Sequence, residues 1–302
     1  MIATMRAALF LTLTVAVGCA SAQGAEPVRQ IERAGLSAER APWPAPIVPS
    51  RDDVTRARAL LATMPAAACP SEMARVGASC IDRWEAHLLT LGNDGRLLRH
   101  PHHLRPPEFW FVAASAAGVP PQGYISRRES ALACEAADKR LCSHREWRRA
   151  CTGSAGRRYP YGWSGQRGTC NVGKDHLLFA KYGKGPWEYD AHFNSPALNQ
   201  EPGFLEPSGT HDRCVSPEGV HDLVGNLHEW VAGTVTESFV AEMEDEPVSR
   251  REQPWVEGNG IFMGGFYSTL DQLGPGCFYT TIAHEPTYHD YSTGFRCCKD
   301  AE

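Results

Sequence analysis

The residues most able to do chemistry lie in one segment, GVHDLVGNLHEW at positions 219–230. Four residues of this segment could supply oxygen ligands, two through carboxylates and two through backbone carbonyls: Asp222, Glu229, Gly225 and Leu227. Calcium is a hard cation that takes about six to eight such oxygens. The alternative interpretation is a Gly-Asn turn between two apolar runs, with both acids in water. Because the segment lacks the Asp/Asn alternation of an EF-hand loop, spacing alone leaves both interpretations open.

The cysteines form the second set of reactive side chains. Of eleven in the chain, Cys19 lies in an N-terminal leader. The ten that follow are Cys69, Cys80, Cys134, Cys142, Cys151, Cys170, Cys214, Cys277, Cys297 and Cys298. An even number in an exported chain favours disulfides. Zinc is the competing interpretation, but no CxxC pair occurs, and adjacent cysteines suit two different bridges better than one tetrahedral site. We therefore expect five disulfides, whose pairing cannot be deduced from spacing alone.

The N-terminal residues predict export. Arg6 precedes the apolar residues 7–18, and Ala20 to Ala22 form a small-residue cleavage pattern. This arrangement is typical of a bacterial export signal over residues 1–22, which is too short to span a membrane. Cys19 also resembles a lipoprotein processing site. We therefore expect a protein that is periplasmic, anchored to the outer membrane by a lipid on this cysteine, or extracellular.

The rest of the chain divides into a tether and a folded domain. Residues 23–68 are rich in proline and alanine and predict a stiff tether, with one short helix over residues 51–64. The folded domain is expected over residues 69–302. A net charge of −5 and a pI near 6.2 give no concentrated basic face, so we expect no nucleic-acid partner.

Two capping boxes give the clearest structural signals in the folded domain. Ser126 with Glu129, and Ser143 with Glu146, each predict the start of a helix, and Gly153 predicts the end of the second one.

From residue 73, alternating apolar and β-branched residues predict strands in which Asp82 and Glu85 face water. Residues 174–210 show no usable periodicity, which indicates either unread local structure or part of a binding surface.

Seven segments occur in an order that resembles one family: IDRWEA, RRESALACEAADKRLCSHREWRRACTG, RRYPYGW, CNV, GVHDLVGNLHEWV, GGFYS and TGFRCC. Together they resemble the formylglycine-generating enzymes, also called sulfatase-modifying factor domains, from about Cys69 to Asp300. The resemblance implies a single α+β domain that is irregular and loop-rich, similar to the C-type-lectin-like class. It also implies that calcium and buried disulfides stabilise the domain.

The same resemblance implies particular pairs and ligands. The implied disulfides are Cys134–Cys297 and Cys151–Cys277, with Cys142–Cys298, Cys170–Cys214 and Cys69–Cys80 left for the other cysteines. The implied calcium ligands are Asp222, Gly225, Leu227 and Glu229, and a second calcium site would begin at Asn171 and Val172. The remaining ligands of that second site fall where this sequence diverges from the family.

The catalytic centre is where the resemblance ends. Oxidases of this family bind copper(I) through two cysteines in the interval that here runs from Gly264 to Cys277, and they convert a sulfatase cysteine to formylglycine. In this chain the interval contains no cysteine before Cys277, which the resemblance assigns to a disulfide. Serine and threonine cannot replace a thiolate on copper(I). We therefore expect neither copper nor the family's oxidase reaction.

Three functions stay open. The first is a binding module for a peptide, a glycan or an envelope protein. The second is a diverged oxidase with non-haem iron, acting on a peptide or a siderophore-type substrate, since histidine and carboxylate ligands suit iron(II). The residues that could line such a cleft are Tyr267, Asp271, His284, Glu285, His289 and Asp290. The third is a structural partner in an envelope assembly. The sequence has no GxSxG, HExxH or phosphate-binding glycine loop.

Overall fold

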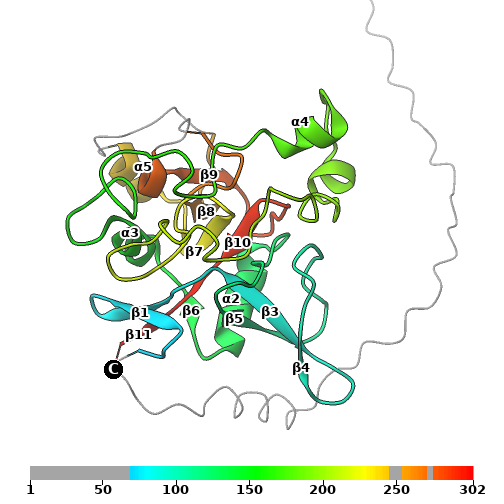
Figure 1. The fold of residues 1–302 in the computed structure, drawn as a ribbon, viewed down its shortest axis with the longest axis horizontal. Helices are drawn as coiled ribbons and strands as arrows, with labels where there is room; N and C mark the ends of the chain where they lie inside the picture. The colour runs from blue at the N-terminus through cyan, green and yellow to red at the C-terminus, as the bar shows by residue number, and fades with distance from the viewer. Residues whose placement is uncertain (1–68, 245–253, 271–274, 302) are drawn as a thin grey trace, which may run out of the picture. The chain divides into compact units, whose positions relative to one another are not determined.

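The computed structural model describes residues 69–244, 254–270 and 275–301, which all belong to one compact unit (Figure 1). The strands are β1 (Met73–Val76), β2 (Ser79–Asp82), β3 (Ala86–Leu91), β4 (Leu97–Arg99), β5 (Phe111–Ser115), β6 (Arg140–Leu141), β7 (His228–Thr234), β8 (Gly260–Met263), β9 (Thr280–His284), β10 (Thr293–Phe295) and β11 (Cys297–Asp300). The helices are α2 (Arg127–Ala136), α3 (His144–Thr152), α4 (Leu177–Tyr182), the π-helix η1 (Tyr189–Phe193), α5 (Glu237–Glu244) and the 3₁₀ helix η3 (Gly276–Phe278). The export signal with Cys19, the tether and the helix over residues 51–64 lie outside the described residues.

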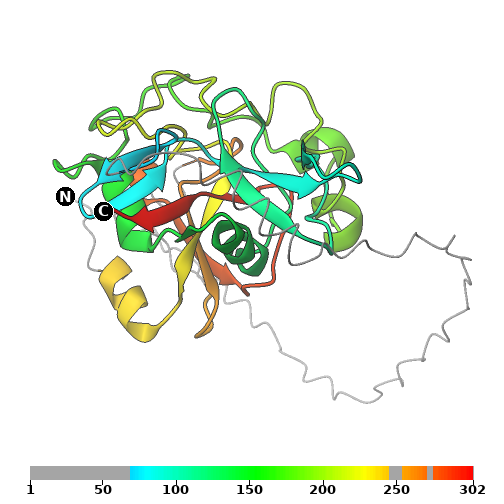
Figure 2. The ribbon, with the colours of Figure 1, turned by 90° about the horizontal axis from the view of Figure 1, so that it is seen from below.

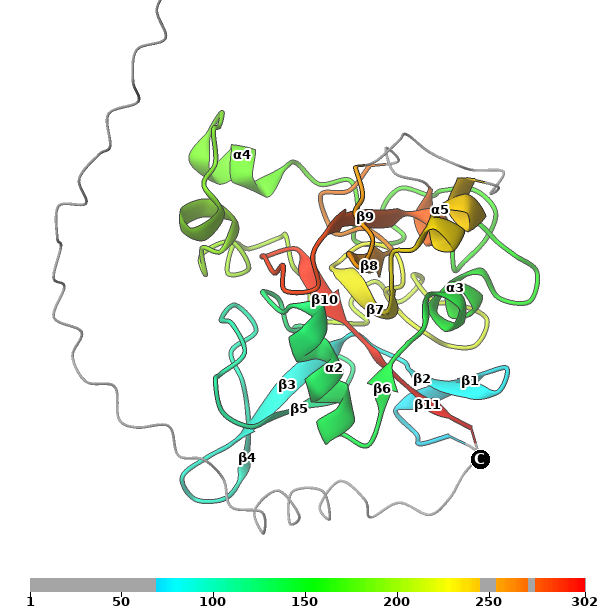
Figure 3. The same ribbon diagram turned by 180° about the vertical axis from the view of Figure 1, so that it is seen from behind.

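Three small sheets organise the unit. Their strand orders are β1-β2-β11-β6, β10-β7-β8-β9 and β4-β3-β5. Most neighbours are antiparallel, but β10 runs parallel to β7, with Gly294 opposite Glu229. Helix α2 packs on β5, β6 and β7, and α3 packs on β2 and β7 (Figures 2 and 3). The mixed α+β, loop-rich architecture expected from the sequence is confirmed.

Both predicted capping boxes are present, and they start the two helices that cover the sheets. The Ser126 and Ser143 side chains accept hydrogen bonds from the backbone N–H groups of Glu129 and Glu146, and each glutamate accepts one in return from the cap residue. Helix α3 ends at Gly153, whose positive φ of 62° is in the region that glycine adopts most readily. These boundaries are set by local chemistry, which is why the sequence predicted them.

Replacing Ser143 by alanine is expected to lower the free energy of unfolding by about 1 kcal/mol, because the orphan N–H of Glu146 loses its acceptor. Urea unfolding followed by circular dichroism would measure the change. The control is Ser154→Ala, in the exposed turn after α3, where no measurable change is expected. Equal losses in the two variants would contradict the assigned role of the cap.

Disulfides fasten the C-terminal strand on both of its sides. The five pairs in the structure are Cys69–Cys80, Cys134–Cys297, Cys142–Cys298, Cys151–Cys277 and Cys170–Cys214. They are the five pairs that the family resemblance implied. Successive side chains of a strand point to opposite faces, so Cys297 joins the apolar cluster around Trp230 while Cys298 joins the cluster around Trp147.

One sequence prediction about this part of the fold is wrong. Asp82 and Glu85 do not face water: their exposed fractions are 0% and 1%. Asp82 is buried against Lys139, whose Nζ lies 2.7 Å from Oδ1, and Glu85 is buried against Asn226. Alternation along a strand shows which side chains share a face, but not that the polar face meets solvent. Residues 174–210 contain α4 and η1, which confirms the alternative of unread local structure in this stretch. Both helices are too short to produce a clear periodic pattern.

Within the described ranges, every helix is too short or too polar to pass through a lipid bilayer.

Candidate functional site

The segment 219–230 meets the C-terminal strands at a buried cluster of charges, which we call the Arg296 junction: Glu85, Asp222, Glu229 and Arg296. Arg296 donates from Nε to Glu229 Oε2 and from Nη2 to Glu229 Oε1, both at 2.6 Å. The Trp147 indole N–H donates to the same Oε2 at 2.7 Å. Both charged side chains are almost fully buried. Strand β7 and the residue before β11 are therefore joined by a bidentate ion pair, the strongest geometry for such a pair.

The other two carboxylates of the junction are held by neutral donors. Glu85 accepts hydrogen bonds from Asn226 Nδ2 at 2.6 Å, Ser208 Oγ at 2.9 Å and the Leu227 N–H at 3.2 Å. Burial, together with the charges of Asp222 and Glu229, holds the pKa of Glu85 well above its usual range. Burial raises the pKa of Asp222 to about 6.

Backbone geometry fixes the turn that presents these residues. Gly225 has φ +83°, and a Cβ at this position would lie 2.1 Å from the Asn171 carbonyl oxygen. Asn226 also has a positive φ of 59° and donates its N–H to that same carbonyl. Only glycine fits at position 225, because a side chain would both clash and strain the backbone. The Gly-Asn turn that the sequence suggested is present, with its acids buried rather than in water.

The calcium site predicted at Asp222, Gly225, Leu227 and Glu229 stays a prediction, and one of its four expected ligands, Glu229, is already engaged in this arrangement. A carboxylate offers about four lone-pair sites, and three donors from Arg296 and Trp147 already use Glu229. A calcium ion on this carboxylate would also lie beside a buried guanidinium cation. The described residues contain no group of three or more His, Cys, Asp or Glu side chains placed to hold a metal ion.

The second predicted calcium site, at Asn171 and Val172, also has a cation of the chain beside it. Lys174 Nζ lies 2.8 Å from the Phe204 carbonyl oxygen and 3.3 Å from Glu206 Oε1. Asn171 Nδ2 donates to the same Phe204 carbonyl at 2.9 Å. One atom would suit a metal ion, since Asn171 Oδ1 is buried without a hydrogen-bond partner in the described part of the chain.

The interval that carries the copper ligands in the family holds a structural disulfide here. Cys277 lies in η3 and is bonded to Cys151 of α3. All ten cysteines from Cys69 to Cys298 are bonded in pairs. No thiol of the folded domain is therefore available to coordinate copper(I).

The residues proposed for an iron cleft do not gather around one point. Tyr267 is fully buried in an apolar cluster, where its hydroxyl donates to Asn199, so it does not line a cleft. Asp290 is also buried and accepts from Tyr288 Oη at 2.7 Å. Glu285 is exposed, and Asp271 lies outside the described residues. These positions share a short stretch of sequence, but the fold directs their side chains to different environments.

His284 and His289 do lie close to one group of aromatic side chains, which we call the aromatic face: Tyr189, Tyr288 and His284. Tyr189 is exposed, whereas Tyr288 and His284 are half-buried. The ring centroids of Tyr189 and Tyr288 are 5.5 Å apart, and those of Tyr288 and His284 are 3.9 Å apart in a stacked pair. Tyr189 has an exposed fraction of 39%. Its hydroxyl donates to the His289 carbonyl at 2.6 Å, which ties η1 to the segment between β9 and β10.

Polar side chains border the aromatic face. Arg105 donates to Glu129 at 2.6 Å and to Nε2 of His289, whose Nδ1 lies 2.7 Å from Asn194 Oδ1. Both ring nitrogens of His289 are thus engaged and neither is free for a metal ion. The sequence analysis missed Tyr189 and Arg105, because they come from segments 100 and 184 positions away from His289. Their partners are set by tertiary contacts, and no local pattern marks them.

His228 is a buried neutral histidine at the start of β7. Its ring packs among Phe262, Phe266 and Tyr279, with centroid distances of 4.6, 4.9 and 5.5 Å. Its Nδ1 is buried with no hydrogen-bond partner in the described structure. Burial lowers the pKa of His228 to about 3. The folded state therefore resists protonation of this ring.

Acid is expected to destabilise the fold partly through His228. In the unfolded chain the pKa is near 6.5, so the stabilising effect is complete above that value and is lost as the pH falls toward the folded value of about 3. The loss between pH 7 and pH 4 is expected to be about 2–3 kcal/mol. A His228→Leu variant should show a correspondingly flatter pH dependence of its unfolding free energy. An unchanged pH dependence would contradict the neutral buried state.

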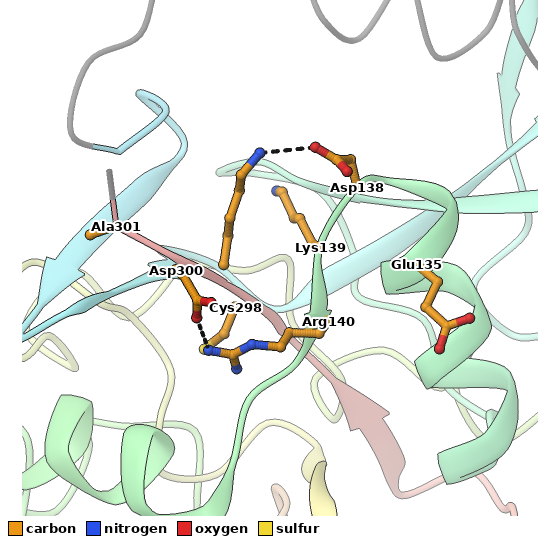
Figure 4. A pocket seen from close by; sticks show the side chains of 8 residues that line it. Glu135, Asp138, Lys139, Arg140, Cys298, Asp300 and Ala301 are labelled. Carbon is orange, nitrogen blue, oxygen red and sulfur yellow. Dashed lines mark hydrogen bonds and ion pairs between the residues drawn. The ribbon is translucent and has the colours of Figure 1, made fainter.

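A surface pocket of about 470 Å³ lies beside the C-terminal strand (Figure 4). Its charged side chains are paired with one another: Arg140 reaches Asp300 at 2.6 Å, and Lys299 reaches Asp138 at 2.9 Å. Lys139 is directed to the buried Asp82. Because most of these charges neutralise each other, the pocket offers few free charges to a ligand. It is a weaker candidate for function than the aromatic face.

Comparisons with known proteins agree with the order of motifs. A family model described as Sulfatase-modifying factor enzyme 1-like domain matches residues 112–301. No curated protein sequence matches the chain.

Among solved structures, Treponema denticola variable protein 1 is similar at 11% identity and a TM-score of 0.43, over 76% of this chain and 99% of that one. PvdO from Pseudomonas aeruginosa is 13% identical with a TM-score of 0.41, over 74% and 80%. The Major Tropism Determinant P3c variant is 14% identical with a TM-score of 0.39, over 76% of this chain. This chain spans about half of that protein, 53% of its length.

Proposed function

Since this chain belongs to the family of sulfatase-modifying factor enzyme 1-like domains, we propose that it is an exported binding module that keeps the family scaffold and has lost the copper oxidase centre. The observation that carries the proposal is that the interval from Gly264 to Cys277, in which the family places its reactive thiols, has Cys277 as its single cysteine. Cys277 is bonded to Cys151 and is not a free thiol. Without a thiolate pair, copper(I) has no soft ligands there.

The aromatic face supplies the binding surface in this proposal. Ligand sites combine aromatic side chains with a few polar groups that fix orientation. Tyr189, Tyr288 and His284 provide adjoining rings. Arg105 and Glu129 provide a donor and an acceptor at their border, and Arg105 keeps half of its side chain exposed. Rings next to neutral and paired polar groups suit the alternating CH and OH faces of a sugar, so we assign the ligand to the glycans.

A direct assay separates binding from oxidation. The purified mature protein would be analysed for bound copper and iron, and for oxygen uptake in the presence of a sulfatase-derived peptide that contains the target cysteine. We expect neither bound metal nor formylglycine product. Stoichiometric iron or copper together with oxygen uptake would overturn the binding proposal and support an atypical oxidase.

Replacing Tyr189 by alanine is expected to weaken glycan binding at least about tenfold, because an exposed aromatic anchor is lost. Tyr189→Phe should keep most of the affinity, since it removes only the hydrogen bond to the His289 carbonyl. Binding would be measured first on a glycan array and then by titration calorimetry with the best glycan.

The matched control is Phe179→Ala on α4, which removes an aromatic ring of 58% exposed fraction outside the aromatic face. It should bind like the unmodified protein. Equal affinity in Tyr189→Ala and Phe179→Ala would show that the aromatic face is not the site. Binding to a peptide array and to no glycan would overturn the assigned ligand class.

A further inference from the structure

We infer that the loop after α3, residues 153–168, is a contact surface for an anionic membrane, with Trp163 at the level of the lipid headgroups. We call these residues the Trp163 loop. The loop lies apart from the aromatic face, so this role is independent of the proposed function. Two features carry it: an exposed tryptophan on a braced turn, and positive charge around that tryptophan without acidic partners.

The Trp163 loop holds a large apolar side chain in water. Trp163 has an exposed fraction of 60%, the largest of any phenylalanine, tyrosine or tryptophan in the described residues. Its indole N–H has no hydrogen-bond partner in that part of the chain. Tryptophan is enriched where membranes meet water, because its ring is apolar and its N–H needs a polar partner. A lipid headgroup region would satisfy both parts of this side chain.

The turn that presents the ring is held in one conformation. The backbones of Tyr159 and Gly162 exchange hydrogen bonds of 2.9 and 3.1 Å. The rings of Tyr159 and Tyr161 stack with their centroids 5.5 Å apart. Disulfides fix Cys151 before the loop and Cys170 after it. A side chain on so rigid a support loses little further freedom on binding, which favours contact with a partner.

Positive charge surrounds the ring. Between Glu146 and Asp175 the sequence has six basic residues and no acidic one, although the whole chain has a net charge of −5. Three of the six belong to the loop: Arg157, Arg158 and Arg167. Within the described ranges these three side chains form no ion pair. A basic side chain near an anionic membrane raises the affinity about fivefold, so the three together suit such a surface.

The loop also lies where a membrane would leave the proposed binding surface free. It runs along the side of the unit away from α4 (Figures 1 and 3). Helix α4 packs beside η1, which carries Tyr189 of the aromatic face. A membrane against the Trp163 loop would therefore leave the aromatic face open to its ligand.

An acidic polysaccharide is the other anionic partner to consider. An extended sugar chain is bound best by several exposed rings in a row or by a groove. In this loop Tyr159 and Tyr161 are half-buried and stacked on each other, and Trp163 alone is exposed. A single protruding ring with basic residues on both sides of it fits a flat anionic surface better.

The test measures co-sedimentation of the mature protein, residues 23–302, with lipid vesicles. This form lacks Cys19 and carries no lipid of its own. We expect binding to vesicles of one-third phosphatidylglycerol and two-thirds phosphatidylcholine, and none to phosphatidylcholine alone. Raising the salt from about 0.1 M to about 1 M should release the protein, because the Debye length falls from about 10 Å to about 3 Å.

Two variants separate the contributions of charge and ring. Replacing Arg157, Arg158 and Arg167 together by glutamine should weaken binding to the anionic vesicles about 100-fold, at about fivefold for each arginine. Trp163→Ala should weaken it about tenfold. Both variants should keep the melting temperature of the unmodified protein, because they change side chains at the surface of the unit.

The matched controls make the same changes elsewhere. Trp255→Ala removes an exposed tryptophan outside the loop. Glutamine at Arg96, Arg99 and Arg128 removes three charges from other exposed positions. Both controls should bind within about twofold of the unmodified protein. Equal weakening in the loop variants and the controls, or no binding to the anionic vesicles, would overturn the inference. Binding to heparin but not to vesicles would also overturn it, and would assign the loop to an acidic polysaccharide.

Discussion

The Arg296→Met variant is expected to lose about 3–5 kcal/mol of unfolding free energy, the usual effect of removing one partner from a buried ion pair. The loss has a clear source. Glu229 would remain buried at the centre of the fold with only the Trp147 indole N–H as a donor. The carbonyls of Asp82 and His221 would lose their donors in the same step. Urea unfolding at neutral pH would measure the change.

Arg140→Met provides the comparison, because this arginine pairs with Glu146 and Asp300 where all three are partly solvated. Exposed pairs contribute about 0–1 kcal/mol. A double variant, Glu229→Leu with Arg296→Met, should recover part of the loss, since it leaves no unpaired charge from the couple. A loss below 1 kcal/mol in Arg296→Met would mean that water or another cation reaches Glu229, and the assignment of this junction as the central tie of the fold would then be wrong.

The junction also shows where sequence reasoning stopped. The segment 219–230 stands out in the sequence because its acids and its Gly-Asn turn are close together, and the turn is present. Its true partners are distant: Glu85 is 141 positions from Asn226, and Arg296 is 67 positions from Glu229. A search limited to local spacing could find the acids but not the cation that neutralises one of them. The metal ion at these carboxylates is implied by the family resemblance, not by their spacing, and stays a prediction.

The two capping boxes illustrate the opposite case. Every atom that starts α2 and α3 lies within four consecutive residues, so the sequence contains all the information needed. The disulfide pairs lie between these extremes. They join residues up to 163 positions apart, and spacing could not pair them, but the order of family motifs could. Tyr189 and Arg105 had neither a local pattern nor a family motif, and the aromatic face was not predicted.

Replacing both Cys151 and Cys277 by alanine is expected to lower the unfolding free energy by about 5 kcal/mol in the chain-entropy model, with a measured range of about 2–5 kcal/mol for native disulfides. The bond closes a loop of 126 positions and links α3 to η3 within the main apolar cluster. The unfolded chain gains much conformational freedom when so long a loop opens. Both cysteines are replaced together, so no new free thiol complicates the measurement.

The matched control replaces Cys69 and Cys80, whose bond spans only 11 positions. The same model gives about 3 kcal/mol for a loop of that length, so the two variants should differ by about 2 kcal/mol in denaturant unfolding under non-reducing conditions. Equal losses would show that strain or local packing, rather than loop length, decides the contribution of these bonds.

The Cys151–Cys277 bond also bears on function. In the family's oxidases, cysteines before the position of Cys277 do redox chemistry, whereas here the cysteine of this interval is assigned to holding the fold. Loss of the Cys151–Cys277 bond should therefore reduce stability, while the protein that remains folded should bind the glycan with unchanged affinity. If binding falls by more than the amount of folded protein does, the disulfide is part of the binding site itself.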